Sequence, residues 1–133
     1  MDNCIFCQIV AGKSPSWKVM ETEHAYAFLD INPVSEYHTL VIPKAHHRDV
    51  FDTPAETLGH VMDLVKQVTT LYQDKLGINN VQLINSNGRE AQQDVFHIHF
   101  HIVPRRLGDG QNIRWHTYPE WRLKFDQLLE KIR

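Results

Sequence analysis

The 133-residue sequence predicts an α+β fold, in which an antiparallel sheet has helices on one side. Three observations support this prediction. Candidate strands outnumber candidate helices, most connections are short, and residues 95–103 alternate between apolar and other side chains. Short connections favour hairpin pairing, which makes neighbouring strands antiparallel. A sheet with one apolar face is buried most simply by helices that pack against that face.

The first part of the chain predicts one short helix and three strands. The helix is expected over residues 4–11, and the strands over residues 17–21, 24–31 and 38–42. Gly12 ends the helix, because glycine favours the backbone conformation that follows a last helical turn. Asn32-Pro33 and Pro43 close the second and third strands, since proline and asparagine favour turns.

The second part begins with the clearest helix, which starts after Thr53-Pro54. This pair predicts an N-cap followed by proline at the first helical position. Apolar residues at three- and four-residue steps predict one buried stripe, namely Leu58, Val61, Val65, Val68, Tyr72 and Leu76. Gly77 ends this helix. Strands over residues 81–84 and 95–103 follow, separated by a polar loop, and an amphipathic helix is expected over residues 119–132.

Length and composition limit the class of protein. A chain of 133 residues predicts a single domain over residues 1–133. The formal net charge of −2 gives no basic surface for a nucleic acid polymer. No apolar stretch approaches the roughly 20 residues of a membrane-spanning helix, and residues 1–7 lack the features of a secretory signal. We therefore expect a cytoplasmic protein that binds neither nucleic acid polymers nor membranes.

The most informative segment is the histidine run, residues 97–103. Because strand side chains alternate, His97, His99 and His101 share one face, and the apolar residues between them share the other. Core packing does not require three imidazoles in a row, which disfavours ordinary surface histidines. A three-histidine zinc site is disfavoured by distance. At ~3.3 Å per residue, His97 and His101 lie ~13 Å apart, too far for zinc–nitrogen bonds of about 2.0–2.1 Å.

The chemistry of imidazole suggests a division of labour along the run. A neutral imidazole, with an ordinary pKa near 6.5, is available at physiological pH as a nucleophile or base. It can take a phosphoryl-type group and form a covalent intermediate that water then opens. A histidine two residues away can protonate the leaving atom. Positioning and charge neutralisation supply the rest of such catalysis.

The histidine run resembles the signature of the histidine-triad family. Residues 4–10, 27–33 and 38–44 also resemble segments of that family, in the expected order. The similarity extends from about residue 4 to residue 106. Residues 111–133 form a carboxy-terminal extension that we do not match to the family.

The resemblance implies a five-stranded antiparallel sheet in the histidine-triad fold and a homodimer. It also implies attack on the α-phosphate of a purine nucleotide conjugate, which forms a nucleotidyl-histidine. By position in the motif, His99 would be the nucleophile, and His101 would contact the phosphate and the leaving group. His97 would have a structural role, through a hydrogen bond or a metal.

Several further residues match substrate-binding positions of the family. Asp30 matches the residue that holds the ribose hydroxyls, and its alternative role is to cap the turn at Asn32-Pro33. Three apolar residues match the base pocket, although each could be ordinary core: Ile5, Phe6 and Ile31.

The loop before the histidine run departs from the family pattern. Gln93 and Asn87 are the expected substrate contacts in this loop. Gln92 takes the place of a glycine, and Tyr37 replaces the usual glycine before His38. Glycine at such positions permits close approach of the backbone to phosphate. The departures therefore bear on substrate preference more than on the type of reaction.

The two cysteines predict a structural zinc site. Cys4 and Cys7 lie three residues apart, on one face of a helix. A closed tetrahedral site needs two more ligands, and His46 and His97 match the histidines of the cysteine-bearing branch of the family. His47 is an alternative to His46, and two thiols without a metal are the alternative to the whole site.

The predicted function is hydrolysis at the α-phosphate of nucleoside phosphoramidates or dinucleoside polyphosphates. The motif does not choose between these two substrate classes. A nucleotide-binding sensor or scaffold that lacks turnover is the alternative, as is a zinc-organised interaction module. Intact His99 and His101 favour the enzyme, because a protein that only binds nucleotides has no need of both.

Overall fold

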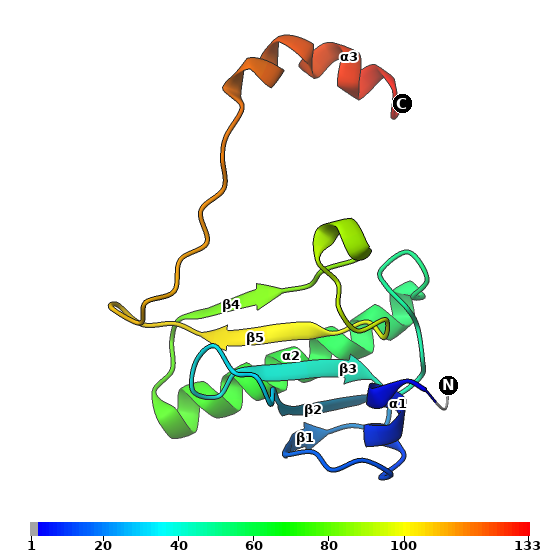
Figure 1. Ribbon diagram of the computed structural model, residues 1–133, viewed down its shortest axis with the longest axis vertical. Coiled ribbons are helices and arrows are strands. Elements are labelled where there is room, and N and C mark those ends of the chain that lie inside the picture. The colour runs from blue at the N-terminus through cyan, green and yellow to red at the C-terminus, as the bar shows by residue number, and fades with distance from the viewer. Residues whose placement is uncertain (1–2) are drawn as a thin grey trace.

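The computed structural model describes residues 3–133, and each predicted helix and strand has a counterpart in it (Figure 1). Met1 and Asp2, which enter the argument against a secretory signal, lie outside the described residues. The elements in chain order are α1 (Ile5–Val10), β1 (Lys18–Glu21), β2 (Ala25–Leu29), β3 (Thr39–Pro43), α2 (Ala55–Leu76), β4 (Val81–Ile84), the 3₁₀ helix η1 (Arg89–Ala91), β5 (Phe100–Pro104), the 3₁₀ helix η2 (Pro119–Lys124) and α3 (Phe125–Glu130).

The five strands form one sheet in the order β1-β2-β3-β5-β4, and all neighbouring strands are antiparallel. The predicted α+β class and five-stranded antiparallel sheet are therefore confirmed. The strand β5 lies between β3 and β4, so that the end of the histidine run is paired on both sides. In the pairing with β3, His101 lies opposite Leu40.

The two faces of the sheet bury different side chains. The helix α2 packs on one face (Figure 1), where Val61, Leu64 and Val68 meet Val41 and Ile102. On the opposite face, α1 contributes Phe6 and Ile9 to a second apolar cluster with Phe28, Leu40 and Ile42. The expectation that helices lie on one side thus describes α2 alone. The short helix α1 occupies the other face, because its two buried side chains fill the space above β2 and β3.

The strand predicted over residues 95–103 is shorter in the structure and begins at Phe100. The register between β3 and β5 would place Ile98 opposite Pro43, and proline has no N–H to continue the ladder. The backbone instead finds other partners: the Ile98 N–H donates to the His47 carbonyl at 2.8 Å, and the Asn85 side chain donates to the His99 carbonyl at 2.9 Å. His97 and His99 therefore lie on irregular backbone.

The start of α2 differs by one residue from the prediction. Pro54 itself is the N-cap residue, and the Thr53 hydroxyl donates to the Asp49 carbonyl at 2.6 Å instead of capping the helix. Gly77 ends the helix in the left-handed conformation, with φ of 67°, as predicted. The buried stripe also includes Leu64, whereas Leu76 is exposed at the last turn.

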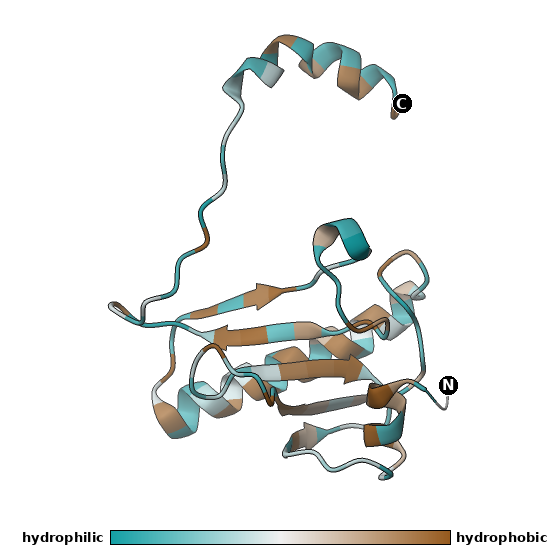
Figure 2. Cartoon of the chain, in the orientation of Figure 1, coloured by the Kyte–Doolittle hydropathy of each residue, from teal (hydrophilic) through white to brown (hydrophobic). Residues whose placement is uncertain are grey.

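The carboxy-terminal arm, residues 111–133, leaves the sheet and runs away from it (Figure 1). Arg105 holds the start of the arm against the sheet. Its guanidinium donates to Asp109 at 2.7 Å and 3.0 Å, to the Gln82 side chain at 2.5 Å and to the Gln111 carbonyl at 2.6 Å. The predicted helix is divided into η2 and α3, along which apolar and polar residues are mixed (Figure 2). Its apolar side chains are exposed rather than buried. Those side chains are Trp121, Leu123, Phe125, Leu128, Leu129 and Ile132.

No helix in the described part of the chain is long and apolar enough to cross a membrane. The single domain over residues 1–133 and the cytoplasmic location stay predictions.

Candidate active site

A cavity of about 570 Å³ opens on the face of the sheet that carries α1. His99 and His101 line it together with Asp30 and Asp94, and apolar side chains form most of the remaining wall. The apolar part comes from α1, the segment before β1, β2 with the turn after it, and β3, and includes Ile5, Phe6, Ile9, Trp17, Phe28, Leu29, Ile31 and Leu40. A mostly apolar concave site with a few converging polar groups is the usual form of a small-molecule site.

His99 is nearly buried and has one nitrogen committed to the backbone. Its Nδ1 lies 2.8 Å from the carbonyl oxygen of His97. Because a carbonyl only accepts, Nδ1 carries the proton, and the neutral ring keeps its lone pair on Nε2. The Phe6 ring packs against the imidazole edge-on, with ring centres 5.3 Å apart. The free nitrogen, Nε2, lies 3.8 Å from Asp94 Oδ1, a residue of the cavity wall.

His101 is paired with His38, the buried residue that precedes β3. His38 Nε2 lies 2.9 Å from His101 Nδ1, and the Val34 N–H donates to His38 Nδ1 at 3.1 Å. Since His38 Nδ1 accepts, its Nε2 carries the proton and donates to His101 Nδ1. His101 then holds its own proton on Nε2. Burial lowers the pKa of His38, and burial followed by the neighbouring His99 lowers the pKa of His101 to about 4, so both rings are neutral near pH 7.

Asp30 caps the turn after β2 and also lines the cavity. Its Oδ1 accepts from the Asn32 N–H at 2.8 Å, which is the turn cap that the sequence left open as an alternative. Its Oδ2 lies 3.4 Å from His38 Nε2 and 4.0 Å from His101 Nδ1. Asp30 also lines the cavity, so the cap does not exclude a contact with a ligand.

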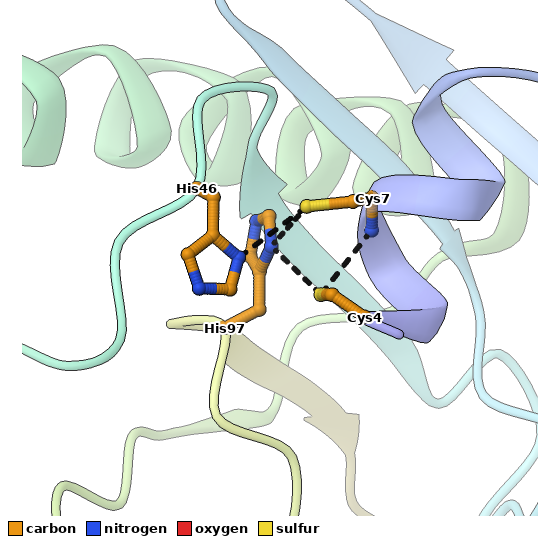
Figure 3. Close-up of side chains that lie close together, drawn as sticks. All are labelled: Cys4, Cys7, His46 and His97. Atoms are coloured by element: carbon orange, nitrogen blue, oxygen red, sulfur yellow. Dashed lines mark hydrogen bonds between the residues drawn. The ribbon is translucent and has the colours of Figure 1, made fainter. Parts of the chain in front are cut away.

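The second group of polar side chains comprises Cys4, Cys7, His46 and His97, whose ligand atoms lie within 4.8 Å of one another. We call this group the thiol cluster. Cys4 is the N-cap residue of α1 and Cys7 lies in its first turn, whereas His46 comes from the loop after β3 and His97 from the segment before β5. All four side chains point toward one another (Figure 3). Of the two candidate histidines His46 and His47, the structure places His46 in the thiol cluster.

The distances in the thiol cluster match a tetrahedral metal. Cys7 Sγ lies 3.3 Å from His46 Nδ1 and 3.6 Å from His97 Nδ1, and Cys4 Sγ lies 3.5 Å from His97 Nδ1. Zinc bonds of about 2.3 Å to sulfur and 2.0–2.1 Å to nitrogen place sulfur and nitrogen ligands about 3.5 Å apart at the tetrahedral angle. His97 Nε2 lies 2.8 Å from the Pro43 carbonyl, which orients its Nδ1 lone pair toward the sulfurs.

Charge in the thiol cluster also bears on metal binding. Burial lowers the pKa of His97 to about 4, so that this ring is neutral near pH 7. Burial and the neighbouring Cys4 thiol raise the pKa of Cys7 to about 11. A metal ion must therefore displace thiol protons when it binds, which makes binding stronger at higher pH.

The HIT domain family model matches residues 11–108, well over half of the chain. The chain belongs to the HIT domain family.

Two solved structures and one curated relative illustrate how this HIT protein compares with others. A Streptococcus mutans crystal structure superposes with a TM-score of 0.92 at 37% identity, covering 99% of this chain and 84% of that one. A zinc-bound histidine triad family protein from Mycobacterium smegmatis superposes with a TM-score of 0.79 at 35% identity, covering 98% of each chain. Adenosine 5′-monophosphoramidase HNT1 from Candida albicans is 38% identical over 138 residues, covering 98% of this chain and 90% of the relative.

The two positions of this HIT protein at which other residues replace glycine have positive φ. Tyr37 has a φ of 63° and Gln92 a φ of 70°. Residues with a Cβ rarely adopt this conformation, whereas glycine adopts it without strain. Tyr37 packs against Tyr72, with ring centres 5.4 Å apart, and Gln92 is exposed after η1. The chain keeps the backbone shape that glycine would favour, at a conformational cost.

The cavity wall does not include Gln93 and Asn87, which the sequence predicts as substrate contacts. The Gln93 side chain is buried, accepts from the Gly88 N–H at 2.8 Å and donates to the Arg48 carbonyl at 2.7 Å. Asn87 accepts from the Val50 N–H at 2.7 Å and donates to the Asn85 side chain. Both residues therefore hold the loop in place, and their polar atoms are already used within this HIT domain.

Three of the residues in or beside the site that sequence reasoning missed bear on its chemistry. His38 appeared only as the start of a strand, although its neighbour Leu40 pairs with His101 across the sheet. Trp17 precedes β1 and joins the cavity wall with an exposed indole. Asp94 lies three residues before the histidine run and lines the cavity, and an acidic side chain so close to that run was the available signal.

Proposed function

We propose that this HIT protein is a hydrolase that cleaves adenosine phosphoramidates at the α-phosphate through a nucleotidyl-His99 intermediate. The observation that carries the proposal is the state of His99. Its Nδ1 proton is held by the His97 carbonyl at 2.8 Å, which leaves the Nε2 lone pair at the cavity that His99 lines. A nucleotide-binding sensor needs no nucleophile in that state, so this geometry supports the enzyme over the sensor.

In the first step, His99 Nε2 attacks the α-phosphorus and the bond from phosphorus to the leaving nitrogen breaks. The departing amine needs a proton. It takes this proton from solvent, while the His101 Nε2–H, oriented because His38 donates to the other nitrogen of that ring at 2.9 Å, donates a hydrogen bond to the leaving nitrogen. The products of this step are nucleotidyl-His99 and a free amine.

In the second step, water attacks the same phosphorus and the bond to His99 Nε2 breaks. The proton of the attacking water passes to solvent, which supplied one in the first step, and His101 keeps its Nε2 proton throughout. The electron pair of the broken bond returns to His99. The net reaction converts one conjugate and one water into a nucleoside monophosphate and an amine.

The shape of the cavity supports binding of a nucleoside beside these histidines. Phe6 and Phe28 are buried side chains of its wall, whereas Ile5 and Ile31 are exposed by 45% and 72%. Such partly exposed side chains still have apolar area to bury against a purine base. Asp30 Oδ2 offers an acceptor for a ribose hydroxyl, since its Oδ1 is held by the Asn32 N–H.

Relatives of this chain support the phosphoramidate class over dinucleoside polyphosphates. Several are named adenosine 5′-monophosphoramidase, including relatives in Saccharomyces cerevisiae and Schizosaccharomyces pombe. We therefore expect the chain to hydrolyse adenosine 5′-phosphoramidate with a higher kcat/KM than diadenosine tetraphosphate. A higher kcat/KM for the polyphosphate would assign the enzyme to the second class.

The decisive variant is His99→Ala. It should lower turnover of adenosine phosphoramidate by about 10³-fold or more, because the nucleophile is gone, while binding of AMP measured by calorimetry survives. The control is His60→Ala on α2, a helix on the opposite face of the sheet, which should keep wild-type turnover. Undiminished turnover in His99→Ala would remove the mechanism. Turnover absent from the wild type as well would favour the sensor.

We also infer that the thiol cluster holds one structural zinc ion. The support is the donor set of two thiols and two imidazoles and the agreement of three sulfur–nitrogen distances with a tetrahedral site. Zinc bound there would connect α1 to the segment that carries His97 and would add to stability. Metal analysis of untagged protein should give close to one zinc per chain. Occupancy well below one half after zinc supplementation would refute this site.

We infer further that the protein is a homodimer. The carboxy-terminal arm supports this, because each of its large apolar side chains is exposed by 39% or more in a single chain. Exposed apolar surface on this scale marks a protein interface. Light scattering should give twice the mass of one chain. The mass of one chain at micromolar concentration would contradict the dimer.

A further inference from the structure

Asp94 lies beside the nucleophile and is not used by the proposed mechanism. Its Oδ1 is 3.8 Å from His99 Nε2, and the side chain is 85% exposed. The carboxylate is held in place by the Val95 N–H, which donates to Oδ1 at 2.9 Å. Since Asp94 lines the cavity and is largely open to water, it lies at the mouth of the cavity, next to the reacting phosphorus.

The formal charges in the cavity wall are all negative. Asp30 and Asp94 contribute two carboxylates, and among the residues that the structure describes, neither lysine nor arginine lines this cavity. His101 is neutral near pH 7, as described above. A site for phosphate compounds usually offers positive charge to its ligand. Here the α-phosphate of the proposed substrate would bind in a cavity whose charged wall residues are both carboxylates.

The position of the leaving group follows from the chemistry. The nucleoside occupies the apolar part of the wall, so the rest of the conjugate extends toward the open mouth. The phosphorus approaches His99 Nε2 to about 3–3.5 Å before attack, and the leaving nitrogen lies beyond it. The Asp94 carboxylate is then a few ångströms from the leaving group, well within the Debye length of about 8 Å at physiological salt.

We propose that Asp94 selects the leaving group by charge, favouring amines that carry a positive group over amines that carry a negative one. This inference rests on the proposed phosphoramidase function and deepens it. Cleavage of the phosphorus–nitrogen bond and protonation of the leaving nitrogen are the same for every amine. Asp94 changes only the electrostatic free energy of the bound conjugate. The preferred leaving groups are then diamines and other amines that carry a second, positively charged group.

The expected size of the effect follows from Coulomb's law. At roughly 6 Å in bulk water, one unit charge changes affinity about threefold, and a less polar mouth makes the change larger. A leaving group with one positive charge and one with one negative charge differ by two units. Asp94 should therefore separate them by about tenfold.

The test uses three adenosine 5′-phosphoramidates with matched chains and the same phosphorus–nitrogen bond. Their amines are 1,4-diaminobutane, butylamine and 4-aminobutanoate, which place a positive, a neutral and a negative group at the same distance. We measure kcat/KM of each for the wild type and for Asp94→Asn, which keeps an oxygen for the Val95 N–H. The intrinsic reactivity of each amine cancels in the ratio of variant to wild type.

On Asp94→Asn, kcat/KM for the diamine conjugate should fall about tenfold relative to that for the aminobutanoate conjugate. The control is Asp74→Asn, which removes the same charge from an exposed position on α2 and should keep the wild-type ratio. The inference would be overturned if the ratio of kcat/KM for the diamine conjugate to that for the aminobutanoate conjugate in Asp94→Asn stays within twofold of the wild-type ratio. An equal change in both variants would also overturn it, because the net charge alone would explain that change.

The same three conjugates distinguish this inference from the proposed function. If the wild type cleaves none of them, the phosphoramidase function fails, and the conjugates remain intact ligands. Their dissociation constants, measured by calorimetry, then decide whether Asp94 discriminates charge. A tenfold change between the diamine and aminobutanoate conjugates supports discrimination, and equal changes exclude it.

Discussion

Two groups of histidines flank His99, and their imidazole rings make opposite hydrogen bonds to the backbone. The thiol cluster and the trio of Asp30, His38 and His101 each bring ligand atoms within 4.8 Å of one another. In the thiol cluster, His97 donates from Nε2 to the Pro43 carbonyl, and its Nδ1 lone pair faces the cysteine sulfurs. In the trio, His38 accepts the Val34 N–H on one nitrogen and donates to His101 from the other.

This comparison teaches that the partner of one ring nitrogen decides the role of the other. The Pro43 carbonyl accepts from His97 Nε2, so His97 Nδ1 keeps a lone pair. The Val34 N–H donates to His38 Nδ1, so His38 Nε2 carries a proton, and that proton fixes the tautomer of His101. The residue type is the same in both groups, and the backbone group that faces each ring makes the difference.

The largest effect is expected from breaking the thiol cluster. Cys7→Ser removes one ligand of the proposed zinc and should reduce zinc from about one per chain to nearly none. The free energy of unfolding should fall by several kcal/mol, since a structural metal contributes directly to folding. Elemental analysis and urea unfolding measure the two changes. The control is His47→Ala, next to His46 but outside the cluster, which should keep its zinc; loss of zinc from both variants would contradict the assignment.

The second effect concerns the trio. His38→Phe removes the proton that orients His101 and should lower kcat about 10²-fold, at the lower end of the range for losing one hydrogen-bond donor to the reacting group. KM should change by less than about threefold, because His38 is absent from the cavity wall. Steady-state kinetics with adenosine phosphoramidate measure both constants, and His24→Phe, an exposed histidine on the turn before β2, is the control. A change in KM alone would mean that His38 shapes the pocket and does not position His101.

The third effect follows from the neutral state of His101. Burial, followed by the neighbouring His99, lowers its pKa to about 4, against about 6.5 in an unfolded chain. As the pH falls below 6.5, the unfolded state binds the proton first, so the native state loses stability until the pH reaches about 4. Between pH 6.5 and 5 this loss should be roughly 1–2 kcal/mol.

Urea unfolding at several pH values tests this contribution. His101→Asn should show a smaller loss of stability over the same pH interval than the wild type. His116→Asn, on the exposed carboxy-terminal arm, should lose as much stability as the wild type. Equal losses in all three proteins would show that other groups account for the acid sensitivity.

The smallest effect concerns the loop between η1 and His97, which contains Gln92. Gln92 has a φ of 70°, and glycine at this position should stabilise the protein by about 0.5–1 kcal/mol, because the strain of the Cβ disappears. Gln67→Gly, inside α2, should destabilise it by about 1 kcal/mol. Thermal unfolding of the two variants should therefore show shifts of opposite sign. Destabilisation by Gln92→Gly would mean that its side chain contributes more than the backbone strain costs.

The sequence was sufficient for the parts of the molecule that depend on local patterns. Alternation and turn residues predicted the sheet, and the spacing of Cys4 and Cys7 predicted a pair of thiols on one helix face. What it could not provide depends on the register between strands. Pro43 ends the ladder opposite the histidine run, and His38 reaches His101 only because β3 and β5 are neighbours. No periodicity within one strand contains that information.

The short helix α1 has a consequence for how the pocket keeps its shape. Its six residues cannot maintain a helix unaided, yet Ile5 and Phe6 on it form part of the cavity wall. The thiols of Cys4 and Cys7 connect the same turn to the rest of the molecule. If zinc binds as proposed, it stabilises one wall of the proposed nucleoside site, so that removal of the metal should weaken AMP binding while His99 stays in place.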